Sequence, residues 1–224
     1  EFYFNCKVCD LIFNSSKLGE TEKSNGNAKT KKAIGGVVCK NVKTMEEFSV
    51  KADAVVLATG HSANDIYYLI AKYSPLALEA KTFAAGVRVE HPRSLIDAIQ
   101  YHGQVKKELG AAEYRVTTQV DERGVYSFCM CPGGFVVPAS SNNDEIVVNG
   151  MSPSSRKGKF SNAAIVVETT PEDCKSIIEN ESVLAGLFLR TEIEERSMDL
   201  VKENCGGFNV NPQAAPAQRL VDFL

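Results

Sequence analysis

The chain has 224 residues, of which 44% are hydrophobic and 24% are charged, which is ordinary for a globular protein. Its net charge of −3 disfavours general nucleic-acid binding, and no apolar stretch approaches the roughly 18 residues of a transmembrane helix. Seven cysteines at irregular spacing favour reduced thiols in an intracellular compartment over a disulfide framework.

The N-terminal third is predicted to be rich in strands. Residues 2–13, 34–40 and 48–58 carry the apolar runs and the alternation that are typical of strands. Residues 14–32 are polar and contain five lysines, so they predict a solvated loop between the first two strands.

The most informative segment surrounds Gly60. Residues 54–58 form a continuous apolar run, the pattern of a strand covered on both faces in a parallel sheet. Thr59 and Gly60 end the run, and Gly60 has no Cβ to keep a ligand away from the backbone. Ser62 and Asp65 are spaced as a capping box that opens a helix, whose N-terminus favours an anion. This combination predicts a nucleotide site.

The rest of the chain predicts a second domain after Ser74-Pro75, where the helix should end. Residues 83–90 alternate as a strand, and Pro92 suits the first position of the next helix. Short β-like runs separated by turn residues fill residues 114–167, which predicts a small antiparallel sheet or barrel. Residues 181–204 have the period of a helix.

Two pairs of cysteines invite a chemical interpretation. Cys6 and Cys9 are three residues apart on a strand, so their side chains diverge, and structural thiols are favoured over a redox or zinc site. Cys129 and Cys131 share one strand face and precede a Gly-Gly turn. They either face a ligand or pack as small hydrophobic residues, and the second alternative is slightly favoured.

Polar residues in the second domain leave similar alternatives open. Arg88 either forms a surface ion pair with Glu90 or holds a substrate carboxylate, for which its planar fork is suited. Asn149 begins a turn that leads to a basic loop containing Arg156. That loop either binds a phosphate-bearing substrate or NADPH, or is simply solvated.

Five motifs occur in order over nearly the whole chain. They are Val56-Leu-Ala-Thr-Gly-His-Ser-Ala63, Lys81-Thr-Phe-Ala-Ala-Gly-Val-Arg-Val-Glu-His-Pro92, Tyr126-Ser-Phe-Cys-Met-Cys-Pro-Gly-Gly134, Val148-Asn-Gly-Met-Ser152 and Ala215-Pro-Ala-Gln-Arg219. With them the chain resembles a family of uncharacterised FAD-dependent dehydrogenases, Rossmann-type flavoproteins whose FAD domain is interrupted by a second domain.

The resemblance implies an α/β fold with two parts. Residues 1–74 would form a partial Rossmann-like FAD-binding domain with a β-meander, and residues 75–224 an inserted, β-rich α+β domain with a C-terminal helix. The backbone N–H and C=O of Val8 would then meet the adenine edge, and His61 would donate to a phosphate or ribose. The implied cofactor contacts are Val8, Thr59, Gly60 and His61.

The family's FAD domain opens with G-x-G-x-x-G, whose glycines let the backbone cradle the pyrophosphate. None of the sixteen glycines of this chain falls in that pattern, and no closing Gly-rich segment follows residue 222. We therefore expect an internal fragment that is inactive alone.

The resemblance implies an FAD-dependent oxidoreductase of unknown substrate, with FAD as cofactor and NAD(P)H as a possible reductant. The weaker substrate-side candidates are Cys129, Cys131, Asn149 and Arg156. We expect no metal and no nucleic-acid or membrane partner, and a reducing compartment, with the plastid as one possibility. A non-catalytic truncated product with an interaction role is the first alternative, and a flavin-dependent nucleic-acid-modifying protein is the second.

Overall fold

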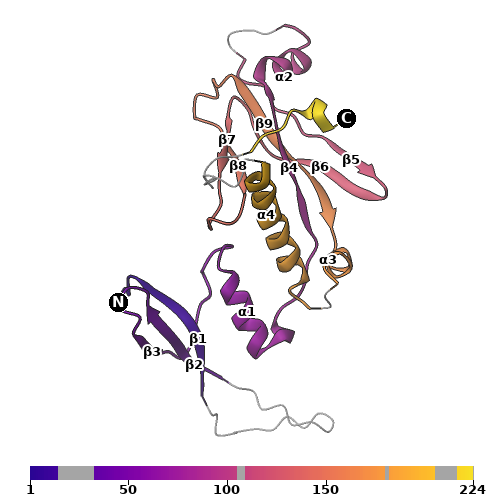
Figure 1. Ribbon diagram of the computed structural model, residues 1–224. Coiled ribbons are helices and arrows are strands. Elements are labelled where there is room, and N and C mark those ends of the chain that lie inside the picture. Colours follow the sequence, from indigo (N-terminus) through magenta and orange to yellow (C-terminus); the bar gives the residue numbers. More distant parts are fainter. Residues whose placement is uncertain (15–32, 105–108, 180–181, 205–215, 224) are drawn as a thin grey trace. The chain divides into compact units, whose positions relative to one another are not determined.

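The computed structural model describes residues 1–14, 33–104, 109–179, 182–204 and 216–223 (Figure 1). The predicted lysine-rich loop, residues 14–32, lies outside them except for its first residue. The described residues form two compact units, Glu1–Leu78 and Glu79–Leu224. The assignment of a cofactor role to the first unit and a substrate role to the second stays a prediction.

The first unit is built on a three-stranded antiparallel meander of order β1-β2-β3. Its strands are β1 (Cys6–Asn14), β2 (Ala33–Asn41) and β3 (Glu47–Lys51). Strand β1 pairs only with β2 among the described strands, and a register shift between Val8 and Asp10 interrupts the pairing. One edge of β1 is therefore left without a strand partner in the described part of the chain.

Helix α1 (Asn64–Tyr73) is tied to β1 by polar and aromatic contacts. Lys7 forms an ion pair with Asp65 at 2.8 Å, and the hydroxyl of Tyr73 donates to Asp10 at 2.6 Å. The rings of Phe13 and Tyr73 lie 4.9 Å apart, centroid to centroid. A short 3₁₀ turn, η1 (Pro75–Ala77), ends the unit.

Two expectations for this unit are wrong. Residues 52–60 are not a strand, since β3 ends at Lys51, and the side chains of Val56 and Leu57 are 87% and 52% exposed. An apolar run becomes an inner strand only between two neighbouring strands, and the described residues supply neither. The predicted capping box is also absent: the N-cap is Ala63, no side chain caps it, and Asp65 pairs with Lys7.

The second unit contains a four-stranded antiparallel sheet of order β4-β9-β6-β5 and a separate two-stranded sheet, β7-β8 (Figure 1). The strands are β4 (Phe83–Pro92), β5 (Thr117–Val120), β6 (Arg123–Cys131), β7 (Phe135–Pro138), β8 (Val148–Met151) and β9 (Phe160–Thr169). Helix α2 (Arg93–Gln100) follows β4 directly. The mixture of helices and sheets confirms the predicted α/β class.

The core of the second unit lies where two helices meet the start of β4. Cys174 of α3 (Pro171–Ile177) and Ala185 and Leu189 of α4 (Ala185–Asn204) are almost fully buried, and Phe83 and Ile178 pack against them. The chain ends with a 3₁₀ turn, η2 (Leu220–Phe223). No described helix has the length and apolarity that crossing a membrane would require.

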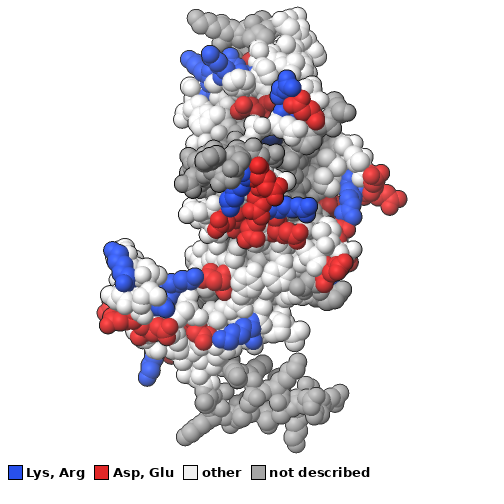
Figure 2. Space-filling model, viewed as in Figure 1, with Lys and Arg blue, Asp and Glu red and all other residues white. Residues whose placement is uncertain are grey.

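Helix α4 carries charges of both signs. Figure 2 shows acidic and basic side chains gathered together over this helix. Arg190 lies 3.8 Å from Glu194, and Lys202 lies 3.8 Å from Asp199, each pair about one turn apart. Such pairs stabilise a helix modestly and leave no surface of a single sign.

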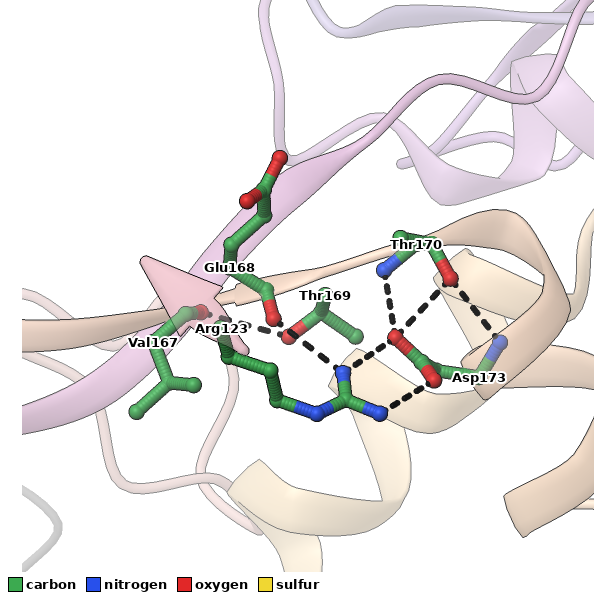
Figure 3. A network of polar contacts seen from close by, with 6 residues as sticks. All are labelled: Arg123, Val167, Glu168, Thr169, Thr170 and Asp173. Atoms are coloured by element: carbon green, nitrogen blue, oxygen red, sulfur yellow. Dashed lines mark hydrogen bonds and ion pairs between the residues drawn. The ribbon is translucent and has the colours of Figure 1, made fainter. Parts of the chain in front are cut away.

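The short helix α3 was not predicted, although its start carries a clear signal. The hydroxyl of Thr170 accepts from the backbone of Asp173, and the Asp173 carboxylate accepts from the backbone of Thr170, a complete capping box. Arg123 of β6 adds two hydrogen bonds to the same carboxylate, at 2.5 and 2.6 Å (Figure 3). These contacts fix α3 to the neighbouring sheet.

Candidate functional site

The cofactor candidate Val8 lies in the part of β1 that contacts the N-terminal turn of α1. Val8 pairs with Cys39 of β2, and its neighbour Lys7 holds Asp65. The hydrogen bond from Lys7 lowers the pKa of the Asp65 carboxyl, which is therefore charged and neutralised by its partner. The strand of Val8 and the start of α1 are thus held together.

Thr59, Gly60 and His61 form an exposed turn just before α1. Gly60 has a φ of +77°, in the left-handed region that favours glycine, and a Cβ added to it would meet no atom within 4 Å. The ring of His61 lies 3.3 Å from the hydroxyl of Ser62 and has no hydrogen bond with another element among the described residues. The backbone of this turn is therefore open to an approaching group.

In the second unit, the guanidinium of Arg88 contacts three other residues. Nε of Arg88 donates to Oδ1 of Asn162 at 2.6 Å, and Nη2 donates to the carbonyl oxygen of Cys129 at 2.5 Å. The same Nη2 lies 3.5 Å from Sγ of Cys131. We call these four residues the Arg88 cluster. It joins β4, β9 and the end of β6, and the expected ion pair between Arg88 and Glu90 is not formed.

The two substrate-side cysteines have different environments within this cluster. Regular pairing of β6 with β9 breaks between Phe128 and Cys131, and Cys129 in the break has a φ of +49°. Cys129 is exposed, whereas Cys131 is only 6% exposed, and both are free thiols. Cys129 lies in this irregular stretch, and its carbonyl oxygen accepts from Arg88. Because Cys131 is buried, its side chain mainly contributes to packing.

Asn149 reaches the cluster through its neighbour. Its Oδ1 accepts from the backbone N–H of Gly150 at 2.8 Å. A Cβ on Gly150 would collide with the guanidinium of Arg88 and with Oδ1 of Asn162, so only glycine lets β8 lie against the pair. The Asn149-Gly150 motif therefore covers the cluster with backbone.

Arg156 contacts the Pro132-Gly133 turn with its backbone, whereas its guanidinium pairs with Glu113. Its guanidinium pairs with Glu113 at 2.5 Å, and its backbone lies against Gly133 so closely that a Cβ there would collide with it. Among the described residues, the Arg156 side chain forms no hydrogen bond or ion pair with the Arg88 cluster. Its backbone thus shapes the Pro132-Gly133 turn, while the charge is neutralised on the surface.

A second polar pair involves β4 and the segment before β5. Nε2 of His91 lies 2.9 Å from the hydroxyl of Tyr114, and Nδ1 of His91 is buried without a hydrogen-bond partner among the described residues. Burial raises the pKa of Tyr114, and the positive charge of Arg88 acts in the opposite direction. His91 thus contacts the segment before β5 and does not cap α2, whose N-cap is Pro92 without a side-chain hydrogen bond.

Sequence reasoning assigned no site role to Asn162, because nothing in its neighbourhood distinguishes it from other strand residues. Arg88 was considered as a carboxylate ligand but not chosen. The structure shows that it contacts two of the four substrate-side candidates, Cys129 and Cys131, and lies against Gly150, the neighbour of a third. Within the described residues, no group of three or more His, Cys, Asp or Glu side chains could hold a metal ion.

Comparison with known proteins adds two findings. Residues 82–224 match the family model described as "FAD-dependent protein, C-terminal domain-like". The chain is also 41% identical over 179 residues to an uncharacterized protein of Clostridium beijerinckii, a match that covers 79% of this chain and 31% of the relative. The chain thus spans about a third of the length of the curated relative that it matches.

Proposed function

Because this chain belongs to the family of FAD-dependent proteins, through the C-terminal domain-like region of that family, we propose that it serves an FAD-dependent oxidoreductase reaction. In this proposal, the first unit contacts the cofactor and the second unit presents the substrate. The bound flavin supplies the electron-transfer chemistry, and the protein orients the reactants and controls their electrostatics.

The observation that carries the proposal is the geometry of Gly60. Its left-handed φ of +77° and the empty space around its Cβ position describe a turn that a large ligand can approach closely. The turn leads into the N-terminus of α1, where backbone dipoles favour an anion such as the FAD pyrophosphate. The negative charge of Asp65 at this end is balanced by Lys7, so it does not repel such a group.

The residues of the first unit fit FAD in position and in chemistry. Val8 lies on β1, which has one side without a strand partner among the described residues, and on that side a backbone donor and acceptor would meet the adenine. Thr59 and Gly60 would lie along the cofactor with backbone groups. His61, which is exposed beside them, would donate to a phosphate or ribose oxygen.

On the substrate side, we propose that the site consists of the Arg88 cluster and of the Asn149-Gly150 backbone that lies against it. Arg88, Cys129, Cys131 and Asn162 come from three adjacent strands and form one connected set of contacts. Arg156 would act indirectly, through its backbone contact with Gly133. We assign the reductant to the nicotinamide class, NADH or NADPH.

The test is rapid-mixing spectroscopy on the natural-length gene product, because the relative that the chain matches is much longer than the chain. The purified product should carry FAD, and anaerobic addition of NADH or NADPH should bleach the visible absorption of the flavin. Readmission of an electron acceptor should restore it. Bound FAD that neither nicotinamide reduces would contradict the oxidoreductase proposal in this form.

A further inference from the structure

Arg88 carries a positive charge that no described acidic side chain neutralises. Its polar contacts are an amide oxygen, a carbonyl oxygen and a sulfur. Several other arginines of the chain do find carboxylates, namely Arg93, Arg123, Arg156 and Arg219. A part-buried charge without a counter-ion is costly, and it is usually completed by an anion.

The residue that holds Arg88 has an unsatisfied donor of its own. Asn162 is 0% exposed, and its Oδ1 accepts from Nε of Arg88. The other atom of this amide, Nδ2, is buried and has no hydrogen-bond partner among the described residues. Buried polar groups without partners are rare and call for an explanation such as an absent ligand. A donor without an acceptor thus lies next to a cation without an anion.

An exposed aromatic side chain lies on the same face of the sheet as Arg88. Arg88 of β4 and Phe128 of β6 both pair with Ala164 of β9, so all three side chains share one face. Phe128 is 61% exposed, and Ala164 between the two larger residues has only a methyl group. The guanidinium-bearing residue and the aromatic residue are therefore separated on this face by the smallest apolar side chain.

We propose that this face binds a substrate carboxylate at Arg88, with the apolar or aromatic body of the same molecule lying over Ala164 against Phe128. This inference rests on the proposed function, because it names the substrate class of that site. Nε and Nη2 of Arg88 are held by Asn162 and Cys129, whereas Nη1 makes no hydrogen bond among the described residues, so one carboxylate of charge −1 can accept from Nη1 and balance the charge. A phosphate dianion generally needs more donors and a second cation, and no other lysine or arginine forms a hydrogen bond or ion pair with this cluster among the described residues.

Benzoate is the direct probe, because it joins one carboxylate to one aromatic ring. The purified 224-residue chain is titrated with benzoate at constant ionic strength, and the arginine Nε signals are followed by ¹H–¹⁵N NMR. We expect a saturable shift of the Arg88 signal with benzoate and none with the neutral isostere benzamide. Inorganic phosphate should bind at least about tenfold more weakly.

Two variants complete the test. Arg88→Lys keeps the charge but loses the guanidinium that Asn162 and Cys129 hold in place, so benzoate affinity should fall about tenfold or more. The matched control is Arg115→Lys, at an exposed arginine outside the Arg88 cluster, which should leave the affinity unchanged. If Arg88→Lys does not fold, the comparison of benzoate with benzamide on the wild-type chain still shows whether the site binds a carboxylate.

The absence of a saturable Arg88 shift, or equal affinities of the wild type and Arg88→Lys, would overturn the inference. Phosphate binding as tight as benzoate would overturn the carboxylate assignment. These measurements involve no flavin. Benzoate binding in a protein whose flavin is not reduced would therefore leave this site standing while the proposed function fails.

Discussion

Gly60 and Gly103 have nearly the same φ angle but occupy different units. Their φ angles are +77° and +76°, and a Cβ at either position would meet no atom within 4 Å. Valine at either position therefore introduces strain without a clash, at a cost of about 1–2 kcal/mol. We expect Gly60→Val and Gly103→Val to lower the free energy of unfolding by similar amounts in urea denaturation. A much larger loss at Gly60 would show that its surroundings are more crowded than described.

Cys131 allows packing and redox roles to be separated at one residue. Its thiol is 6% exposed and lies near Nη2 of Arg88. In Cys131→Ser, the hydroxyl can accept from the guanidinium, so the burial penalty should be only about 1 kcal/mol, at the low end for a buried hydroxyl. We expect this loss in a urea melt and an unchanged rate of flavin reduction in the natural-length product. A slower reduction with normal stability would instead restore Cys131 as a redox residue.

At the residue scale, the sequence indicated local backbone features, whereas it did not indicate the partners of the side chains. Gly60 could be singled out because a glycine at the end of an apolar run often adopts a positive φ angle or lets a ligand approach the backbone. The contact of Arg88 with Asn162 joins residues 74 positions apart, and no local pattern encodes such a pairing. Arg156 was chosen for its basic neighbourhood, yet a distant acid, Glu113, decides where its charge goes.

Among the elements, α3 offers a test of pH dependence. Hydrogen bonds from Arg123, and then from the backbone and hydroxyl of Thr170, hold the pKa of Asp173 well below its usual range (Figure 3). A carboxyl whose pKa is depressed on folding adds stability above its unfolded pKa of about 3.9, and this contribution is lost as the pH falls through the folded pKa. We therefore expect part of the chain's stability to disappear below about pH 4.

The control for this prediction is Asp173→Asn, which removes the titrating group. The variant should be less stable than the wild type at neutral pH, and the gap in melting temperature should narrow as the pH falls below 4. A second variant, Thr170→Ala, should cost about 1 kcal/mol through loss of the cap. A gap between the wild type and Asp173→Asn that stays constant from pH 7 to pH 2 would contradict this account.

Elements with their own periodicity could be predicted, whereas an element that depends on neighbours could not. Strand β2, helix α1 and helix α4 were each foreseen with ends close to those observed. The run 54–58 is as apolar as an inner strand, but it pairs with no described strand, has no regular secondary structure and is mostly exposed. Apolarity indicates that a segment should be buried, and the tertiary partners decide how.

For the whole molecule, the family match coincides with one of the two compact units. The family match covers residues 82–224, nearly the same span as the second unit, Glu79–Leu224. The first unit carries Gly60 and the edge of β1, and the second carries the Arg88 cluster. The α/β class could be predicted from the order of the elements. The catalytic roles could not, because they depend on where a flavin meets a substrate.

The most direct test of the central claim is the FAD affinity of the natural-length gene product with valine at each of the two matched glycines. FAD titration of the apoprotein, followed by flavin fluorescence, gives the dissociation constant. If Gly60 lies at the cofactor, Gly60→Val should weaken FAD binding by at least about tenfold, or roughly 1.4 kcal/mol, while Gly103→Val should bind FAD like the wild type. Equal FAD affinities for Gly60→Val and the wild type would contradict the placement of the cofactor at this turn.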